Sequence, residues 1–318
     1  MNKPENDFAI TRESVYGTQP EPSFAGILSF MRRQYSKSLD GIDLAVVGVP
    51  YDLATTNRSG TRSGPRAIRQ ASSILAWDRV WGWDFDPFDR LAVVDYGDAL
   101  FDSGRPDKAP DEITECFRQI LATDTATLAL GGDHFISYPI LKAYAEKFGP
   151  LSLIHFDAHC DTWRDESGRI DHGTMFFHAA NEGIVDPSRS IQMGMRTNND
   201  ETHGYTVLSA DWLRENGIQT AVERIKACVG DNPCYLTFDI DFLDPAFAPG
   251  TGTPVIGGPS SGEARALLRG LSGINLKGMD LVEVAPAYDV GEITALAGAS
   301  LCMDLISIFA AQYPDRKA

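Results

Sequence analysis

The sequence has few of the features of a secreted, membrane-bound or nucleic-acid-binding protein. Its five cysteines are scattered through 318 residues without C-x-x-C spacing, so neither a disulfide scaffold nor a zinc ribbon is expected. No run approaches the ~18 uninterrupted apolar residues of a membrane span. The segment Met1–Phe30 is polar and lacks the charged start and apolar core of a signal peptide. We therefore expect a soluble, cytoplasmic protein with reduced thiols.

Positive charge is also scarce. The chain carries 44 acidic against 28 basic residues, which gives a formal net charge of -16. Such a surface repels nucleic acid and anionic membranes, and it mildly favours cationic small molecules. The same charge also serves plain solubility. We therefore expect neither a nucleic-acid nor a membrane partner.

The sequence does contain a series of short, continuously apolar runs. This character is typical of parallel strands that are covered on both faces of a sheet. The predicted strands are Leu44–Val49, Leu91–Val94, Thr127–Leu130, Leu151–Phe156, Ser190–Met195, Cys234–Phe238 and Gly278–Val282.

Helical patterns lie between these runs. The predicted helices are Pro65–Ser73, Ile113–Leu121, Ile136–Phe148, a helix with a Ser260–Glu263 capping box, and Ile293–Ala311. The alternation predicts an α/β fold, with a single three-layer α/β/α domain over residues 41–318. We expect a mainly parallel sheet of about eight strands, with ligands bound beyond the carboxyl ends of its strands. Residues 1–40 are predicted to form an N-terminal arm over the surface or into a neighbouring subunit.

Residue types that bind metals cluster at three of these strand ends. They lie in Gly131-Gly132-Asp133-His134, in His155-Phe156-Asp157-Ala158-His159-Cys160-Asp161 and in Phe238-Asp239-Ile240-Asp241-Phe242-Leu243-Asp244-Pro245. Residues two apart in an extended chain point to the same side, so alternate residues of the second and third motifs can converge. The candidate ligands are His134, Asp157, His159, Asp161, Asp239 and Asp241.

This set combines two imidazoles with four carboxylates. Four carboxylates at one point repel one another unless cations neutralise them, and two divalent ions balance their charge. Mixed nitrogen and oxygen ligands suit Mn²⁺ better than a structural zinc, and two metals can share a water and lower its pKa. A lone D-x-D is often only a turn or helix cap, but the coincidence at three strand ends favours a metal centre. We expect His155 on the opposite strand face, in the core or behind the ligands.

These motifs resemble the three signatures of the ureohydrolases, the family of arginase, agmatinase, guanidinobutyrase and formiminoglutamase. The third signature continues through Ala246-Phe247-Ala248-Pro249-Gly250-Thr251-Gly252-Thr253-Pro254. The resemblance runs from about Val47 to the C-terminus and is greatest to the bacterial agmatinases. The further segments that carry it are Gly48-Val49-Pro50-Tyr51-Asp52, Gly64-Pro65-Arg66-Ala67-Ile68-Arg69 and Val282-Glu283-Val284-Ala285-Pro286-Ala287-Tyr288-Asp289.

The resemblance implies an arginase-like fold and two Mn²⁺ ions per subunit. One ion would be held by His134, Asp157, Asp161 and Asp239, and the other by Asp157, His159, Asp239 and Asp241. A bridging hydroxide would attack the guanidinium carbon. Glu283 would pair with the substrate guanidinium, Asp161 would carry a proton to the leaving amine, and His172 would exchange it with solvent. Cys160 stands where we expect threonine or another small residue, which leaves either harmless packing or an oxidation-sensitive thiol.

The loop after the second motif is predicted to overhang the site and to select the substrate. Its acids Asp165, Glu166 and Asp171 could attract the distal ammonium of agmatine. Its bases Arg164 and Arg169 could equally hold the carboxylate of 4-guanidinobutyrate, and a mixed-charge loop is often simply solvated. Compared with the arginases of the family that the chain resembles, the loop lacks the longer polar stretch used for the α-amino acid end. We therefore predict hydrolysis of agmatine to urea and putrescine, with guanidinobutyrase or guanidinopropionase as the alternative.

Two other classes remain open at this point. An amide hydrolase similar to the histone deacetylases would have a mononuclear zinc site, which metal stoichiometry would distinguish. A non-catalytic member of the family would be expected to have lost a ligand, Glu283 or His172, and none is missing. The family resemblance also implies a homo-oligomer, a trimer or a hexamer.

Overall fold

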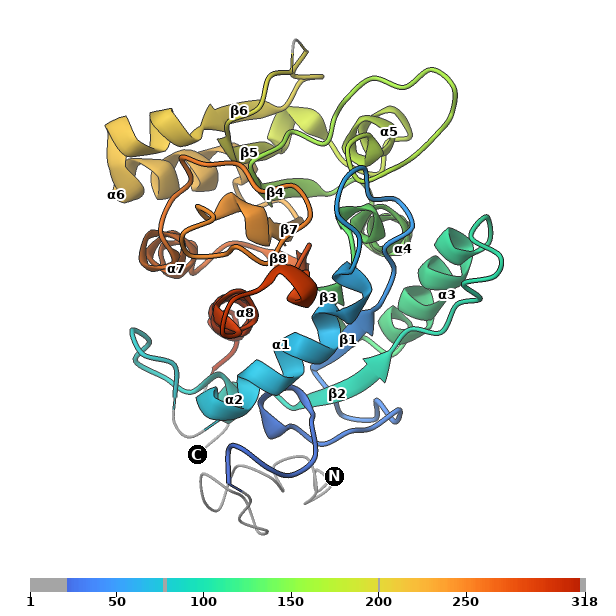
Figure 1. Cartoon of the computed structure of the whole chain (residues 1–318), viewed down its shortest axis with the longest axis vertical. Helices are drawn as coiled ribbons and strands as arrows, with labels where there is room; N and C mark the ends of the chain where they lie inside the picture. The colour runs from blue at the N-terminus through green and yellow to red at the C-terminus, as the bar shows by residue number, and fades with distance from the viewer. Residues whose placement is uncertain (1–21, 77–78, 200, 315–318) are drawn as a thin grey trace.

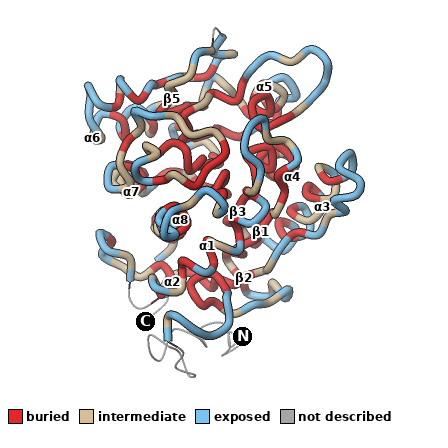
Figure 2. Tube along the Cα trace, in the orientation of Figure 1, coloured by how far each residue is buried: buried red, intermediate tan, exposed pale blue. Residues whose placement is uncertain are grey.

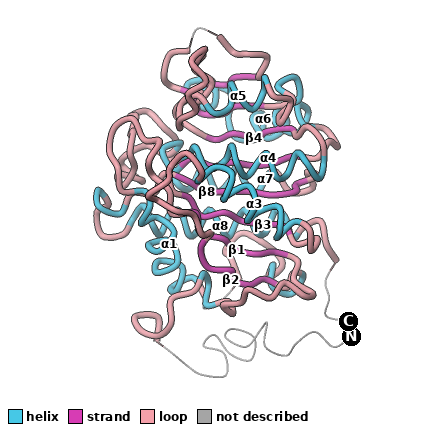
Figure 3. Tube along the Cα trace, turned by 90° about the vertical axis from the view of Figure 1, so that its right-hand side faces the viewer, coloured by secondary structure: helices cyan, strands magenta, loops and turns pink. Residues whose placement is uncertain are grey.

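The computed structural model describes residues 22–76, 79–199 and 201–314. Eight strands form one sheet in the order β2-β1-β3-β8-β7-β4-β5-β6, and each pair of neighbouring strands in the described chain is parallel. Figure 3 shows the strands stacked in one layer. The strands are β1 Leu44–Val49, β2 Val93–Asp98, β3 Ala126–Gly131, β4 Ser152–Phe156, β5 Ile191–Met195, β6 Thr206–Ser209, β7 Cys234–Asp239 and β8 Leu276–Val282.

Helices cover both faces of this sheet, as predicted (Figure 1). Alternate residues of a strand point to opposite faces, so Leu44 and Val46 join one buried cluster while Ala45 and Val47 join the other. The first cluster includes residues of α1, α6, α7 and α8, and the second includes residues of α3, α4 and α5. The helices are α1 Gly64–Ser72, α2 Pro87–Arg90, α3 Ala109–Leu121, α4 Ser137–Phe148, α5 Met175–Asn181, α6 Ala210–Val229, α7 Ser261–Gly270 and α8 Ile293–Ala310.

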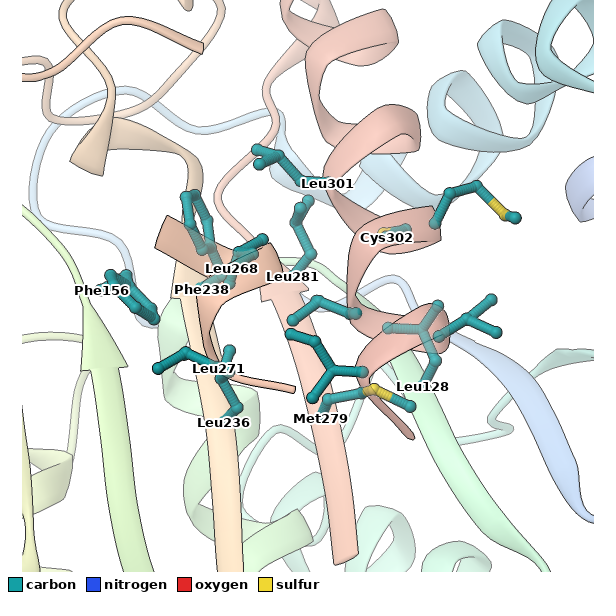
Figure 4. Close-up of a cluster of buried hydrophobic side chains, with 14 of the residues drawn as sticks. Leu128, Phe156, Leu236, Phe238, Leu268, Leu271, Met279, Leu281, Leu301 and Cys302 are labelled. Carbon is teal, nitrogen blue, oxygen red and sulfur yellow. The ribbon is translucent and has the colours of Figure 1, made fainter. Parts of the chain in front are cut away.

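The longest apolar helix, α8, lies against the middle of the sheet. It is the one described helix long and apolar enough to cross a membrane, but 78% of that stretch is buried inside the protein. Figure 4 shows Leu301 and Cys302 of α8 beside Leu281 and Met279 of β8. The length and composition of α8 are therefore accounted for by its place in the core.

Only part of the predicted N-terminal arm falls within the described residues. Residues 22–40 follow the edge of the sheet next to β2, and Phe30 and Met31 are buried in the core. The amide of Phe30 donates to Asp95 Oδ2 at 2.7 Å, and the amide of Met31 donates to Ser72 Oγ at 2.8 Å. Residues 1–21 lie outside the described chain, so the arm and its boundary at residue 40 remain a prediction.

The sequence prediction missed one strand, β6, and three α-helices, α2, α5 and α6. Strand β6 is short and partly exposed at the edge of the sheet, so it lacks the continuous apolar character of the inner strands. Helix α6 contains Gly217 with a φ of 79°, which interrupts the helical pattern, and α5 has only seven residues. Figure 2 shows that buried segments run through the centre of the molecule and that exposed segments lie at its rim.

Candidate metal centre and guanidinium site

Four neighbouring strands end at the same edge of the sheet. In the strand order, β3, β8, β7 and β4 are adjacent, and parallel strands bring their carboxyl ends together. His134 follows β3, Asp157 follows β4, Glu283 follows β8, and Asp239 is the last residue of β7. The topology therefore gathers motifs that are separated by as many as 149 residues in the sequence.

The first half of the candidate metal centre surrounds the ring of His134. Nδ1 of His134 lies 2.9 Å from Asp157 Oδ2, 2.9 Å from Asp161 Oδ2 and 3.2 Å from Asp239 Oδ2. All four side chains are buried. Within the described residues, Nδ1 nevertheless has no partner in hydrogen-bond geometry.

The contacts of the other ring nitrogen, Nε2, determine the tautomer of His134. Nε2 lies 2.8 Å from Thr237 Oγ1, and the Thr237 hydroxyl donates its own hydrogen to Asp280 Oδ1 at 2.5 Å. Asp280 also accepts hydrogen bonds from Ser137 and Tyr235. Since the hydroxyl hydrogen is already used, Thr237 must accept from an Nε2–H group, so the neutral ring turns the lone pair of Nδ1 toward the three carboxylates.

A lone pair facing three carboxylate oxygens is stable only if positive charge lies between them. The pKa of His134 also indicates that this position favours a positive charge. Burial alone would lower this pKa, but Asp157, Asp161 and Asp239 together raise it well above its ordinary value. The nitrogen and oxygen donors match the preferences of a divalent transition metal. The residues of this half-site therefore fit a metal ion.

The second half of the centre surrounds the ring of His159. Its Nδ1 lies 3.2 Å from Asp157 Oδ1 and 3.2 Å from Asp241 Oδ2. Asp157 thus directs one carboxylate oxygen toward each half. Asp157 is therefore shared by the His134 group and the His159 group.

The carboxylates of this cluster affect one another strongly. Burial and the charges of Asp241 and Asp157 raise the pKa of Asp239 well above its ordinary value. Burial and the charge of Asp157 also raise the pKa of Asp161 and of Asp241. Without cations, the cluster would take up protons instead of keeping four negative charges.

The prediction for His155 was wrong about its strand face. Its Nε2 lies 2.8 Å from Asp157 Oδ2, so it is on the ligand side and not on the opposite face. Residues two apart in a strand share a face, and His155 stands two residues before Asp157. Gln192 Nε2 lies 3.1 Å from Nδ1 of His155, so this ring connects the cluster to β5.

Glu283 lies beside the cluster in a strained backbone conformation, with a φ of 64°. Its Oε1 accepts from the amide of His134 at 2.9 Å and lies 2.8 Å from Nδ1 of His172. Its Oε2 is buried and has no hydrogen-bond partner in the described part of the chain. A Cβ at Gly252 would approach Oε2 to 3.2 Å. This bare oxygen is suited to accept from a cationic N–H donor of a ligand.

His172 is held from both sides. The amide of Thr56 donates to Nε2 at 2.9 Å, so Nε2 is an acceptor and the proton of the neutral ring is on Nδ1, facing Glu283. Burial alone would lower the pKa of His172, but the hydrogen bond and charge of Glu283 raise it to about 9. Protonation of Nε2 would break the bond from Thr56, so the two effects oppose each other at this ring.

The loop residues predicted to select the substrate are paired within their own loop. Arg169 Nη2 lies 2.7 Å from Asp171 Oδ2, and Arg164 Nη2 lies 2.6 Å from Glu166 Oε1. Asp165 Oδ1 accepts from the amide and the hydroxyl of Ser167. The contribution of Asp165 and Arg169 to substrate binding remains a prediction.

Cys160 is buried between the loop and the ligands. Its sulfur accepts from Asn199 Nδ2 at 2.7 Å, and the same amide group donates to Thr162 Oγ1 at 2.8 Å. Burial raises the pKa of the Cys160 thiol, which lowers the thiolate fraction and hence its reactivity. The packing interpretation of this cysteine accounts for these contacts.

Comparison with known proteins identifies the family of the chain. The model of the arginase family matches residues 42–307. The chain belongs to the arginase family. An agmatinase of Chromobacterium violaceum is 52% identical over 304 residues, which cover 95% of this chain and 94% of that protein.

Solved structures of other members share the fold. A hypothetical agmatinase from Burkholderia thailandensis matches with a TM-score of 0.92 and 56% identity, over 96% of this chain and 98% of that chain. A proclavaminate amidino hydrolase from Streptomyces clavuligerus matches with a TM-score of 0.87 and 38% identity, over 92% of this chain and all of that chain. The predicted arginase-like fold is therefore confirmed.

The support of His134 was not foreseen from the sequence of this arginase-family chain. Thr237 lies two residues before Asp239 on β7, so the period of the strand already places it on the ligand side. Asp280 lies on the neighbouring strand β8, in the middle of an apolar run. A buried acid inside a central strand is itself a signal, because such a charge needs several hydrogen-bond donors.

We expect Thr237→Val to weaken metal binding without unfolding the protein. Valine removes the acceptor for Nε2 of His134, and loss of such a support typically lowers metal affinity about 10- to 100-fold. Competition with a chelator measures the affinity directly. Thr127→Val is the matched control, because its buried hydroxyl contacts Tyr144 and not the cluster. Equal metal affinity in the two variants would contradict the role assigned to Thr237.

Proposed function

We propose that this arginase-family protein is an agmatinase, which uses two Mn²⁺ ions to hydrolyse agmatine to urea and putrescine. The observation that carries the proposal is the buried, unpartnered Oε2 of Glu283 beside a two-part His/Asp cluster. That combination provides a seat for a cationic guanidinium next to a hydrolytic centre. The agmatinase of Chromobacterium violaceum, 52% identical over nearly the whole chain, supports agmatine as the substrate.

The ligand sets are those that the family resemblance implies. His134, Asp157, Asp161 and Asp239 would hold one ion, and Asp157, His159, Asp239 and Asp241 would hold the other. When bound, such ions lower the pKa of water and supply a hydroxide nucleophile at neutral pH. One oxygen of Asp157 lies near His134 and the other near His159, which supports a bridging role for that residue.

Glu283 orients the substrate. Its Oε1 is already engaged by the His134 amide and by His172, so Oε2 is left to accept from the guanidinium. Charge-assisted hydrogen bonds to a carboxylate fix a planar cation in both position and orientation. Holding the guanidinium in this way removes much of the entropic cost of bringing its carbon to the nucleophile.

Protons are moved by two side chains. Asp161 lies within the cluster, 2.9 Å from Nδ1 of His134, so its carboxylate would stand beside the nucleophile and pass a proton to the amine that leaves. His172 contacts Glu283 on one side and Thr56 on the other. From that position it would exchange the proton with solvent.

Two further properties belong to the proposal. The protein would act in the cytoplasm, since the family consists of soluble enzymes and the cysteines are free thiols. It would assemble as a homo-oligomer, a trimer or a hexamer, as the family resemblance implies. A mononuclear deacetylase-like site is disfavoured by the second His/Asp group around His159.

A parallel assay tests the function. Protein reconstituted with Mn²⁺ is given agmatine, arginine, 4-guanidinobutyrate and 3-guanidinopropionate, and urea release is measured for each. We expect a clear preference for agmatine and loss of activity after treatment with a chelator. Preference for a guanidino acid would retain the hydrolase and reject agmatinase, and absence of urea from every substrate, with two metals bound, would reject both.

A further inference from the structure

An aromatic side chain stands at the open edge of the metal centre. Trp163 follows Asp161 by two residues, and its side chain is 40% exposed. Its ring centroid lies 6.4 Å from that of His159, at an interplanar angle of 52°. The indole thus reaches from the candidate ligands to the solvent, where the remainder of a substrate must extend.

The backbone beside the indole is joined to the segment that carries His172. The amide of Trp163 donates to the carbonyl of Gly173 at 3.0 Å, and Gly173 directly follows His172, which contacts Glu283. The loop is therefore closed on itself at this point, with Trp163 and His172 on its two ends. A substrate bound to Glu283 would therefore lie near the segment that carries the indole.

Gly173 holds the indole in place. A Cβ added at Gly173 would lie 2.8 Å from Cε3 and 3.0 Å from Cζ3 of Trp163, so the ring lies directly against the glycine backbone. The amide of Gly173 in turn donates to Asp171 Oδ1 at 3.0 Å. A ring fixed in this way can receive a ligand without a further loss of side-chain entropy.

The charged residues of the loop are poorly suited to recognise the charge at the far end of a substrate. Arg164 is paired with Glu166, and Arg169 is paired with Asp171. The side chains of Arg164, Glu166 and Arg169 are all more than half exposed, where water and salt weaken their interactions. The paired charges also offset one another, so they distinguish poorly between a substrate with a distal ammonium and one with a distal carboxylate.

We propose that Trp163 is the specificity-determining residue of this site, and that its indole face receives the distal ammonium of the substrate. The proposal rests on the proposed agmatinase function and names the group that recognises the second charge. An aromatic face is electronegative, so it attracts an ammonium and disfavours a carboxylate. The negative potential of the indole face would therefore favour agmatine over guanidino acids. The paired charges of the loop do not provide this preference.

The test compares Trp163→Leu with the wild type on two substrates, agmatine and butylguanidine, which has the guanidinium and alkyl chain but no ammonium. We expect kcat/KM for agmatine to fall about tenfold, mostly through KM, and kcat/KM for butylguanidine to change less than about twofold. Trp163→Phe should retain part of the preference, because phenylalanine keeps a weaker aromatic face. Bound Mn²⁺ and the melting temperature should match the wild type.

A control variant separates recognition from packing. Trp81→Leu replaces another exposed tryptophan, 87% accessible and outside the site, and should leave both substrates unaffected.

The outcomes distinguish the two proposals. Equal losses on agmatine and butylguanidine in Trp163→Leu, or no loss on either, would overturn the role of Trp163 while leaving agmatinase intact. Wild-type protein that cleaves butylguanidine but not agmatine would overturn the function and, with it, this inference.

Discussion

Asp157→Asn is expected to abolish metal retention and to lower urea release by at least about a thousandfold. Asp157 directs one oxygen to each half of the cluster, 2.9 Å from His134 Nδ1 and 3.2 Å from His159 Nδ1. Asparagine keeps the volume but loses the negative charge, and an amide is a much weaker ligand for a divalent transition metal. Metal content after dialysis and the rate of urea release measure the two effects.

Thermal denaturation provides an independent check on Asp157→Asn. A ligand present at 100 times its dissociation constant stabilises a protein by about 2.7 kcal/mol, so a chelator should lower the melting temperature of the wild type. The variant has no metal to lose, and its melting temperature should not respond. Asp211→Asn is the control, because Asp211 is exposed in a surface ion pair with Arg214, and such pairs contribute little. Full metal content in Asp157→Asn would contradict the ligand assignment.

Glu283→Gln is expected to lower kcat/KM for the guanidino substrate by roughly a hundred- to a thousandfold. Loss of one partner from a buried charge pair typically costs about 2–5 kcal/mol. Glutamine preserves an acceptor for the His134 amide, but its NH₂ group would replace the bare Oε2 acceptor. Two sets of N–H donors would then face each other across the guanidinium site.

The metal content of Glu283→Gln distinguishes a role in substrate binding from a role in metal binding. Glu283 is not among the predicted ligands, so bound metal should stay near the wild-type amount while activity falls. Glu182→Gln is a matched control, because that carboxylate accepts from the Tyr138 hydroxyl outside the site. If Glu283→Gln lost metal in proportion to activity, the residue would support the metal centre and not bind the guanidinium.

The metal centre shows how far the sequence alone could predict the site. Motif spacing was sufficient to predict that Asp157, His159 and Asp161 lie together, although the chain leaves the extended conformation after Phe156 and Asp161 has a φ of 51°. The alternation of a strand, applied correctly, would have placed His155 among them. The tautomer of His134 could not be predicted from the sequence, since it depends on Thr237 and Asp280 from two other strands.

The residues that select the substrate could not be predicted from the sequence. The charged loop residues suggested either an ammonium or a carboxylate, because composition does not indicate which charges neutralise one another. The structure pairs Arg169 with Asp171 and Arg164 with Glu166, and it sets Trp163 against Gly173. These are contacts between side chains that no periodicity predicts.

The sequence by itself determined the α/β class, the central strands, the capping box before α7 and the six candidate ligands. Each of these follows from local rules: apolar runs, turn chemistry and the alternation of a strand. Only the tertiary structure decided that β3, β8, β7 and β4 are neighbours, that Glu283 keeps one bare oxygen, and that short edge elements such as β6 exist. The physical reason is that long-range pairing and burial depend on the packing of the whole chain, which local patterns do not encode.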